Sequence, residues 1–126
     1  MTREVKQDGS RVGFEIVDYA TNRKGGLAHI NQAEGPRVSK YRVNLHDLDQ
    51  IGVKAIHDAL EQADVIIIDE IGPMELFSSA FRQVVGNAAD SSKPLLGIIH
   101  YSARDSVIDL VKKRDDVELF TVTMEN

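Results

Sequence analysis

The spacing of apolar residues changes along this chain, and the first thirty residues favour β-strands. In residues 11–18, apolar side chains alternate with polar ones, the period-two pattern of a half-buried strand. Asp8-Gly9 just before it favours a tight turn back to a strand at residues 4–6. A further short strand is predicted at residues 27–30. This part of the chain therefore predicts a small antiparallel meander.

Later in the chain, short apolar runs alternate with stretches of helical period. After Asn44, a good N-cap, apolar residues recur every three or four positions from Leu45 to Gln62. Val65–Ile68 is a run of four aliphatic residues, which predicts a central strand buried on both faces. The predicted strands are 41–43, 65–68, 95–100 and 117–122, and the predicted helices are 45–62, 74–89 and 103–113. This order predicts an α/β fold with a mostly parallel sheet, flanking helices on both faces and right-handed crossovers.

Two carboxylates, Asp69 and Glu70, follow the central strand directly, before Gly72-Pro73 turns the chain away. Ligands of open α/β sheets bind outside the carboxyl ends of the strands, where these two side chains are expected. A lone Asp at this point often only caps a turn, but two adjacent carboxylates make that interpretation weaker. His100 ends the predicted strand 95–100 and is expected on the same sheet edge. There it either senses a phosphate and positions water or makes a local hydrogen bond only.

A carboxylate pair after an apolar strand has the form of a Walker B element. In such elements the first carboxylate helps to hold Mg²⁺, and the second polarises the water that attacks the γ-phosphate. The pattern therefore predicts Asp69 as a metal ligand and Glu70 as a catalytic residue.

Composition limits the classes of protein that remain. With 126 residues, 42% of them hydrophobic, residues 1–126 are expected to form a single domain with a substantial core. The net charge of -5 makes a nucleic-acid or membrane-surface role unlikely. Arg37 and Lys40 lie in a predicted exposed loop, where they either face a phosphate or an acidic partner or are simply solvated. The absence of cysteine excludes disulfides and thiolate metal sites, and no apolar run approaches the roughly 20 residues of a membrane helix. A cytoplasmic protein is predicted.

The run Asp-Glu-Ile-Gly-Pro-Met-Glu-Leu at residues 69–76 resembles the THEP1-type nucleoside-triphosphatases, also called cancer-related nucleoside-triphosphatases. The likeness covers essentially the whole chain, including residues 11–17, residues 41–43 and the closing Thr-Met-Glu-Asn. The resemblance implies a P-loop fold of the RecA-like kind that hydrolyses ATP, GTP and other nucleoside triphosphates with Mg²⁺. On that pattern Asp69 serves the metal and Glu70 activates water.

The chain departs from the family at its start. Family members open with a strand, a Gly-x-x-Gly-x-Gly-Lys-Thr loop and a helix before the position of Met1, and no such loop occurs in these 126 residues. We therefore expect the P-loop strand to be missing, no residues that bind the cofactor nucleotide, and Mg²⁺ only together with a nucleotide. A nucleoside triphosphate is expected to bind only if a P-loop is supplied, so the chain is expected to be inactive by itself.

The expected loss of an internal strand also affects assembly. In RecA-like sheets the P-loop strand lies between the strands predicted here at 95–100 and 117–122, and its absence leaves unpaired edges. A homo-oligomer or a strand-pairing partner is therefore expected.

Three hypotheses for function remain open. The chain is a nucleoside-triphosphatase whose P-loop is lost from this sequence, or a non-catalytic binding or assembly module derived from that fold. The third, ranked last, is a Mg²⁺-dependent phosphotransfer domain of receiver-like type, which needs further acidic residues at the end of an early strand, where this chain offers no obvious candidate.

Overall fold

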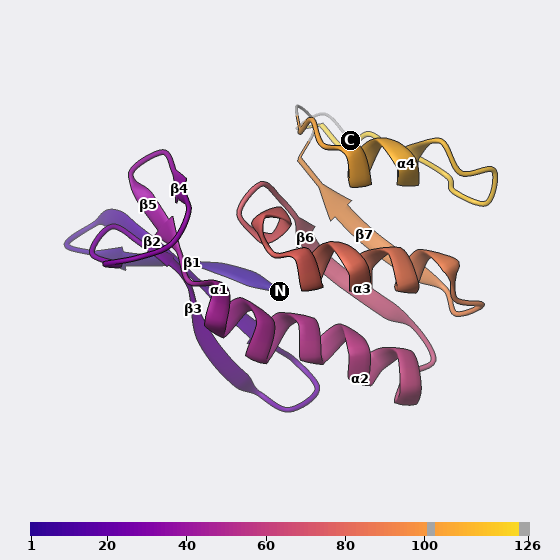
Figure 1. The fold of residues 1–126 in the computed structure, drawn as a ribbon, viewed down its shortest axis with the longest axis horizontal. Coiled ribbons are helices and arrows are strands. Elements are labelled where there is room, and N and C mark those ends of the chain that lie inside the picture. Colours follow the sequence, from indigo (N-terminus) through magenta and orange to yellow (C-terminus); the bar gives the residue numbers. More distant parts are fainter. Residues whose placement is uncertain (101–102, 124–126) are drawn as a thin grey trace.

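The computed structural model describes residues 1–100 and 103–123, and it contains two separate sheets bridged by helices (Figure 1). The strands are β1 Thr2–Gln7, β2 Ser10–Asp18, β3 Arg23–His29, β4 Arg37–Val38, β5 Tyr41–Val43, β6 Ile66–Ile71 and β7 Leu95–Ile99. The helical elements are α1 Leu45–Asp47, η1 Leu48–Val53, α2 Lys54–Gln62, η2 Glu75–Phe77, α3 Ser79–Asp90 and α4 Ser106–Lys112.

The first sheet is antiparallel, with the strand order β1-β2-β3-β5-β4. The predicted meander is confirmed, and Asp8 and Gly9 take φ angles of 52° and 80°, as a tight hairpin turn requires. The strand predicted at residues 41–43 is also confirmed, but its pairing differs from the prediction. It lies antiparallel between β3 and β4 instead of opening a parallel sheet.

The second sheet is a single parallel pair, β6 with β7. The α/β class is confirmed, but the prediction of a mostly parallel sheet is wrong, since five of the seven strands described belong to the antiparallel sheet. The strand predicted at residues 117–122 is wrong as well, because these residues are irregular. A strand needs a neighbour that completes its hydrogen-bond ladder, and these residues join no ladder in the described part of the chain.

The central strand β6 is buried on one face only, contrary to the prediction that both faces are buried. Ile66 and Ile68 are 1% and 5% exposed, whereas Ile67 between them is 65% exposed. Successive side chains of a strand point to opposite faces, and α2 and α3 lie along one side of the parallel pair (Figure 1). Leu96 on β7 is 58% exposed, so the apolar surface extends across both strands.

The helix predicted from Leu45 to Gln62 is confirmed as a continuous helical stretch with a π-helical segment, η1, in its middle. Asn44 caps it as predicted, because its side-chain oxygen accepts a hydrogen bond of 3.0 Å from the N–H of Asp47. Gly52 lies in η1, where a Cβ atom would come within 2.6 Å of the Cδ1 atom of Ile16. The glycine therefore lets the helix pack closely on β2.

The helix predicted over residues 74–89 is divided at Ser78 into η2 and α3. The Ser78 hydroxyl accepts from the N–H of Phe81 at 3.0 Å, which caps α3, and donates to Asp49 at 2.5 Å. The helix predicted over residues 103–113 is confirmed in a shorter form as α4, which Asp105 caps through the N–H of Val107 at 2.8 Å.

One apolar core joins the two sheets. Among its most deeply buried members are Leu27 of β3, Val43 of β5, Leu48 of η1, Ile66 of β6 and Val85 of α3. The site residues therefore lie on elements that share a core with the antiparallel sheet. In the described part of the chain, no helix has the length and apolar character needed to cross a membrane.

Candidate functional site

Asp69 and Glu70 lie near the end of β6, inside the strand and not after it. Asp69 pairs with Ile98 and Ile71 pairs with Ile99, so the ladder is interrupted by a bulge at Glu70. The peptide bond between Asp69 and Glu70 is cis, and both side chains are half-buried. Bulges re-aim side chains next to functional sites, and here Glu70 lines a cavity that Asp69 does not, in addition to a cavity that both line.

Two cavities meet at these carboxylates. Glu70 and His100 line a cavity of about 620 Å³, together with Arg104. Asp69 and Glu70 line a second cavity of about 640 Å³, together with Ile67. Glu70 therefore shares the first cavity with His100 and the second cavity with Asp69.

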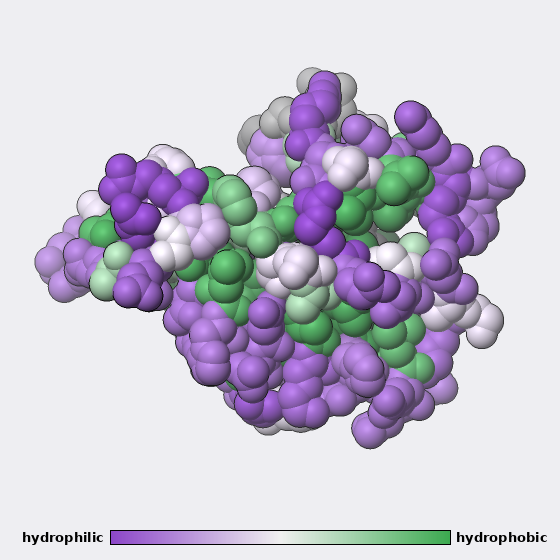
Figure 2. Space-filling view, in the orientation of Figure 1, coloured by the Kyte–Doolittle hydropathy of each residue, from purple (hydrophilic) through white to green (hydrophobic). Residues whose placement is uncertain are grey.

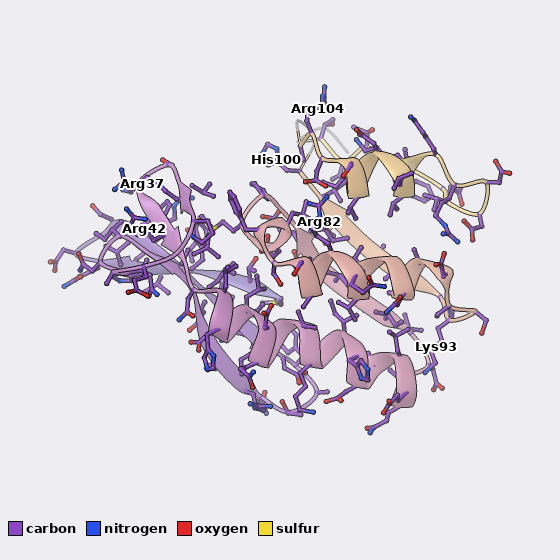
Figure 3. All side chains as sticks on the ribbon, viewed as in Figure 1. Arg37, Arg42, Arg82, Lys93, His100 and Arg104 are labelled. Atoms are coloured by element: carbon purple, nitrogen blue, oxygen red, sulfur yellow. The ribbon has the colours of Figure 1, made fainter. Side chains whose placement is uncertain are left out.

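His100 follows β7 immediately and is exposed. Its carbonyl oxygen accepts a hydrogen bond of 3.0 Å from the N–H of Ala103, which turns the chain toward α4. Figure 3 shows His100 and Arg104 near each other in the region between β7 and α4. This placement is at the sheet edge where His100 was expected.

Glu75 is a further member of the site that the sequence did not single out. Glu75 is 3% exposed, and its carboxylate accepts a hydrogen bond of 3.0 Å from the N–H of Gly72. A Cβ atom on Gly72 would lie 2.9 Å from Oε2 of Glu75 and 3.1 Å from Oε1 of Glu70. Glycine at this position therefore allows two carboxylates to approach the same turn.

The surroundings of Glu75 favour its neutral form. Burial raises the pKa of Glu75 to about 7, and the charge of Glu70 acts in the same direction. The hydrogen bond from Gly72 acts against the rise in pKa, because it favours the carboxylate. A carboxyl group that titrates near neutrality beside Glu70 links the charge of this turn to pH.

Arg82, on α3, links the turn after β6 to the start of α4. Its guanidinium donates to the carbonyl oxygen of Leu76 at 3.2 Å, to Oδ2 of Asp105 at 2.8 Å and to the Ser106 hydroxyl at 2.8 Å. The hydrogen bond from Arg82 lowers the pKa of Asp105. The turn after β6 is thereby fixed relative to Asp105 and Ser106 at the start of α4.

Metal-binding side chains are sparse at the site. In the described residues, no group of three or more His, Asp or Glu side chains is placed to hold a metal ion by itself. Mg²⁺ normally keeps several waters and is held by one or two carboxylates together with substrate phosphates. Asp69 and Glu70 supply hard oxygen ligands of the right kind, so the donor set fits a Mg²⁺ ion that arrives with a nucleotide.

Sequence reasoning missed Glu75 and Arg82 for different reasons. Glu75 lies three residues after Gly72, whose N–H donates to its side chain. A glutamate at the start of a helix often accepts from a backbone N–H at this spacing, so the sequence contained a local signal for this contact. Arg82 carried no such signal, since its partner Asp105 is 23 residues away along the chain.

The fold and the site together define a class. An α/β protein with adjacent carboxylates at the end of a parallel strand has the features of a P-loop NTPase-like protein. The comparisons with known proteins agree: the model of a family described as NTPase matches residues 1–126. The chain is 46% identical to the nucleoside-triphosphatase THEP1 of Thermofilum pendens, over 100% of this chain and 70% of that protein. It is 42% identical to the protein of the same name from Methanosarcina acetivorans, over 99% of this chain and 69% of that protein.

Solved structures give the same result. The crystal structure of THEP1 from Aquifex aeolicus superposes with a TM-score of 0.84 and 26% identity, over 91% of this chain and 70% of that one. The solution structure of a human cancer-related nucleoside triphosphatase gives a TM-score of 0.78 and 32% identity, over 99% and 72%. The chain belongs to the THEP1-type nucleoside-triphosphatase family.

Proposed function

We propose that this chain carries the acidic half of a Mg²⁺-dependent nucleoside-triphosphatase site in a cytoplasmic protein. The observation that supports this proposal is the placement of Asp69 and Glu70 on one cavity wall at the end of β6. In the proposed site Asp69 holds the metal ion, and Glu70 accepts a proton from the attacking water. Bound Mg²⁺ would neutralise charge that develops on the phosphate oxygens.

The other residues of the site act on Glu70 and on the phosphate. Glu75 and Gly72 fix the turn that follows Glu70, through their 3.0 Å hydrogen bond. His100 shares the first cavity with Glu70 and is proposed to contact a phosphate or to orient the water. Arg82 holds the turn after β6 and the start of α4 in fixed relative positions through its hydrogen bonds to Leu76 and Asp105.

Phosphate positioning is the part that these residues do not supply. The sequence contains no Gly-x-x-Gly-x-Gly-Lys-Thr loop, whose backbone N–H groups and lysine cradle the phosphates in P-loop enzymes. We therefore expect residues 1–126 alone to show no saturable binding of Mg²⁺-ATP or Mg²⁺-GTP in calorimetry and negligible turnover. Steady turnover that disappears in Glu70→Gln would contradict this expectation while supporting the role of Glu70.

Supplying the loop is expected to restore activity. When a strand, loop and helix segment with that motif is joined before Met1, nucleoside triphosphates should be hydrolysed, and Glu70→Gln should lower kcat by roughly 100-fold. The reason is that glutamine keeps the shape of Glu70 but cannot accept the proton. Glu61→Gln, at an exposed position of α2 that lines neither cavity, serves as the control and should leave kcat unchanged. An equal loss in both variants would remove Glu70 from the mechanism.

A second function, a non-catalytic assembly module, is favoured by one observation. The open face of β6 and β7 exposes Ile67, Leu96 and Ile98 by 65%, 58% and 45%. A contiguous apolar surface of this kind marks an interaction site. On this alternative the surface pairs two copies of the chain, and light scattering should give a dimer mass that Ile67→Glu reduces to a monomer. A monomeric wild-type chain would exclude it.

A further inference from the structure

Cations without carboxylate partners gather at one end of the antiparallel sheet. Residues 35–43 hold three of the 15 Lys and Arg residues, namely Arg37, Lys40 and Arg42, and none of the 20 Asp and Glu residues. None of the three forms an ion pair within the described residues. Figure 2 shows hydrophilic residues over the β4–β5 hairpin, at the left of the molecule. The chain is acidic overall, so this hairpin stands out as a local positive surface.

Strand register places three nitrogen-bearing side chains in one row. Arg37 of β4 lies opposite Arg42 of β5, and Arg42 lies opposite His29 of β3. Residues directly opposite in an antiparallel pair share a face, with Cβ atoms roughly 5 Å apart, and like charges so placed repel. The N–H of Asn31 donates to Nδ1 of His29 at 3.0 Å, so the neutral imidazole carries its proton on Nε2 and can donate from there.

We propose that the row of Arg37, Arg42 and His29 binds successive phosphate groups of an extended polyanion, whose two candidate sources are the phosphodiester backbone of a nucleic-acid strand and inorganic polyphosphate. The planar guanidinium group of arginine matches phosphate oxygens in geometry and charge, and a bound phosphate would relieve the repulsion between Arg37 and Arg42. Adjacent strands are about 4.8 Å apart, so the row spans about 10 Å and accommodates more than one phosphate.

The overall charge of -5 does not prevent such binding. At physiological ionic strength the Debye length is about 8 Å, so a phosphate at the row is influenced mainly by nearby charges. Figure 3 places Arg37 and Arg42 on the β4–β5 hairpin, well separated from His100 and Arg104, so the row is distinct from the proposed hydrolytic site. Basic residues on an edge strand such as β4 also discourage strand pairing between molecules, a role that requires no ligand.

A binding experiment separates these two roles. Fluorescence anisotropy with a labelled oligouridylate, in low salt and without Mg²⁺ or nucleotide, should show saturable binding by the full 126-residue chain. Replacing Arg37 and Arg42 together with glutamine should weaken binding at least about tenfold and lower the salt dependence by about 1.4 in log–log slope, since two phosphate contacts are lost. Arg37→Lys with Arg42→Lys keeps the charges and should retain most of the binding.

The matched control replaces Arg23 and Lys24, two exposed cations at the opposite end of β3, with glutamine. It changes the net charge by the same amount and should leave the affinity within about twofold, as expected for charges beyond the Debye length. Displacement of the oligouridylate by inorganic tripolyphosphate would show that free polyphosphate also occupies the row. Resistance to displacement would identify the nucleic-acid strand as the ligand.

Two results would overturn the proposal. One is the absence of saturable binding to both probes in low salt, and the other is an equal loss of affinity in the two glutamine variants, which would indicate diffuse attraction only. Arg42 also donates to the carbonyl oxygen of Gly35 at 2.9 Å, so circular dichroism should verify that the double variant is folded. If it is not, Arg37→Gln alone provides the test, because Arg37 is exposed and its side chain forms no hydrogen bond or ion pair in the described residues. Because nucleotide is absent, the outcome is independent of the site at Asp69 and Glu70.

Discussion

Replacing Glu75 with glutamine is expected to stabilise the protein above neutral pH and to flatten the pH dependence of its free energy of unfolding. The carboxyl group of Glu75 is buried, and its pKa is raised from 4.5 to about 7 in the folded chain. The folded state therefore binds more protons than the unfolded state between these two values. Stability from this group is present below pH 4.5 and is lost as the pH rises through about 7.

The magnitude follows from the shift in pKa. At 1.36 kcal/mol per pKa unit, the contribution of Glu75 falls by about 3 kcal/mol between pH 4.5 and pH 8. Glutamine keeps an oxygen that can accept from the N–H of Gly72 but carries no charge, so this loss should disappear. For a protein whose total stability is about 5–15 kcal/mol, a change of this size is easily measured.

Urea unfolding of wild type and Glu75→Gln at several pH values between about 4.5 and 8 tests the prediction. The difference between the two free energies of unfolding should grow with pH in favour of the variant. Glu118→Gln, at an exposed position, is the control and should give a constant difference. A parallel pH dependence for wild type and Glu75→Gln would show that Glu75 is not the titrating group.

Leu48→Ala is expected to cost roughly 3–5 kcal/mol of stability, because it removes a large side chain from the centre of the core. Leu48 is 0% exposed and lies in η1, which packs against β2, β3 and α3. Alanine would leave a cavity at the junction between the antiparallel sheet and the helices that support β6. Gly52, which lies next to Leu48 in η1, has no side chain that could move into the cavity.

The same chemical change at an exposed leucine provides the control for Leu48→Ala. Leu110 on α4 is 68% exposed, so Leu110→Ala should change the free energy of unfolding by less than about 0.5 kcal/mol. Both values come from urea unfolding followed by circular dichroism. A small effect of Leu48→Ala would mean that η1 is not an essential part of the common core.

The apolar run of β6 predicts a strand but not which of its two faces is covered. The aliphatic run was correctly predicted to be a strand, but Ile67 is exposed because α2 and α3 cover one face only. A run of four apolar residues shows that both faces of the strand can be buried, but it does not specify which elements cover them. The paired carboxylates lie near the carboxyl end of this strand but inside it and not after it, and the bulge at Glu70 that interrupts the ladder was not predictable.

The sequence by itself determined the local elements, the family and the acidic pair. Asn44 at the helix start, Asp8-Gly9 in the hairpin and the apolar period of each segment act over a few residues, so they can be read without knowledge of the fold. Only the tertiary structure decided strand pairing, burial and charge environment. Tyr41–Val43 joined β3 and β4, residues 117–122 formed no strand, and Glu75 was buried beside Glu70. The physical reason is that ladder partners, desolvation and neighbouring charges come from residues distant in sequence, whose placement no local pattern encodes.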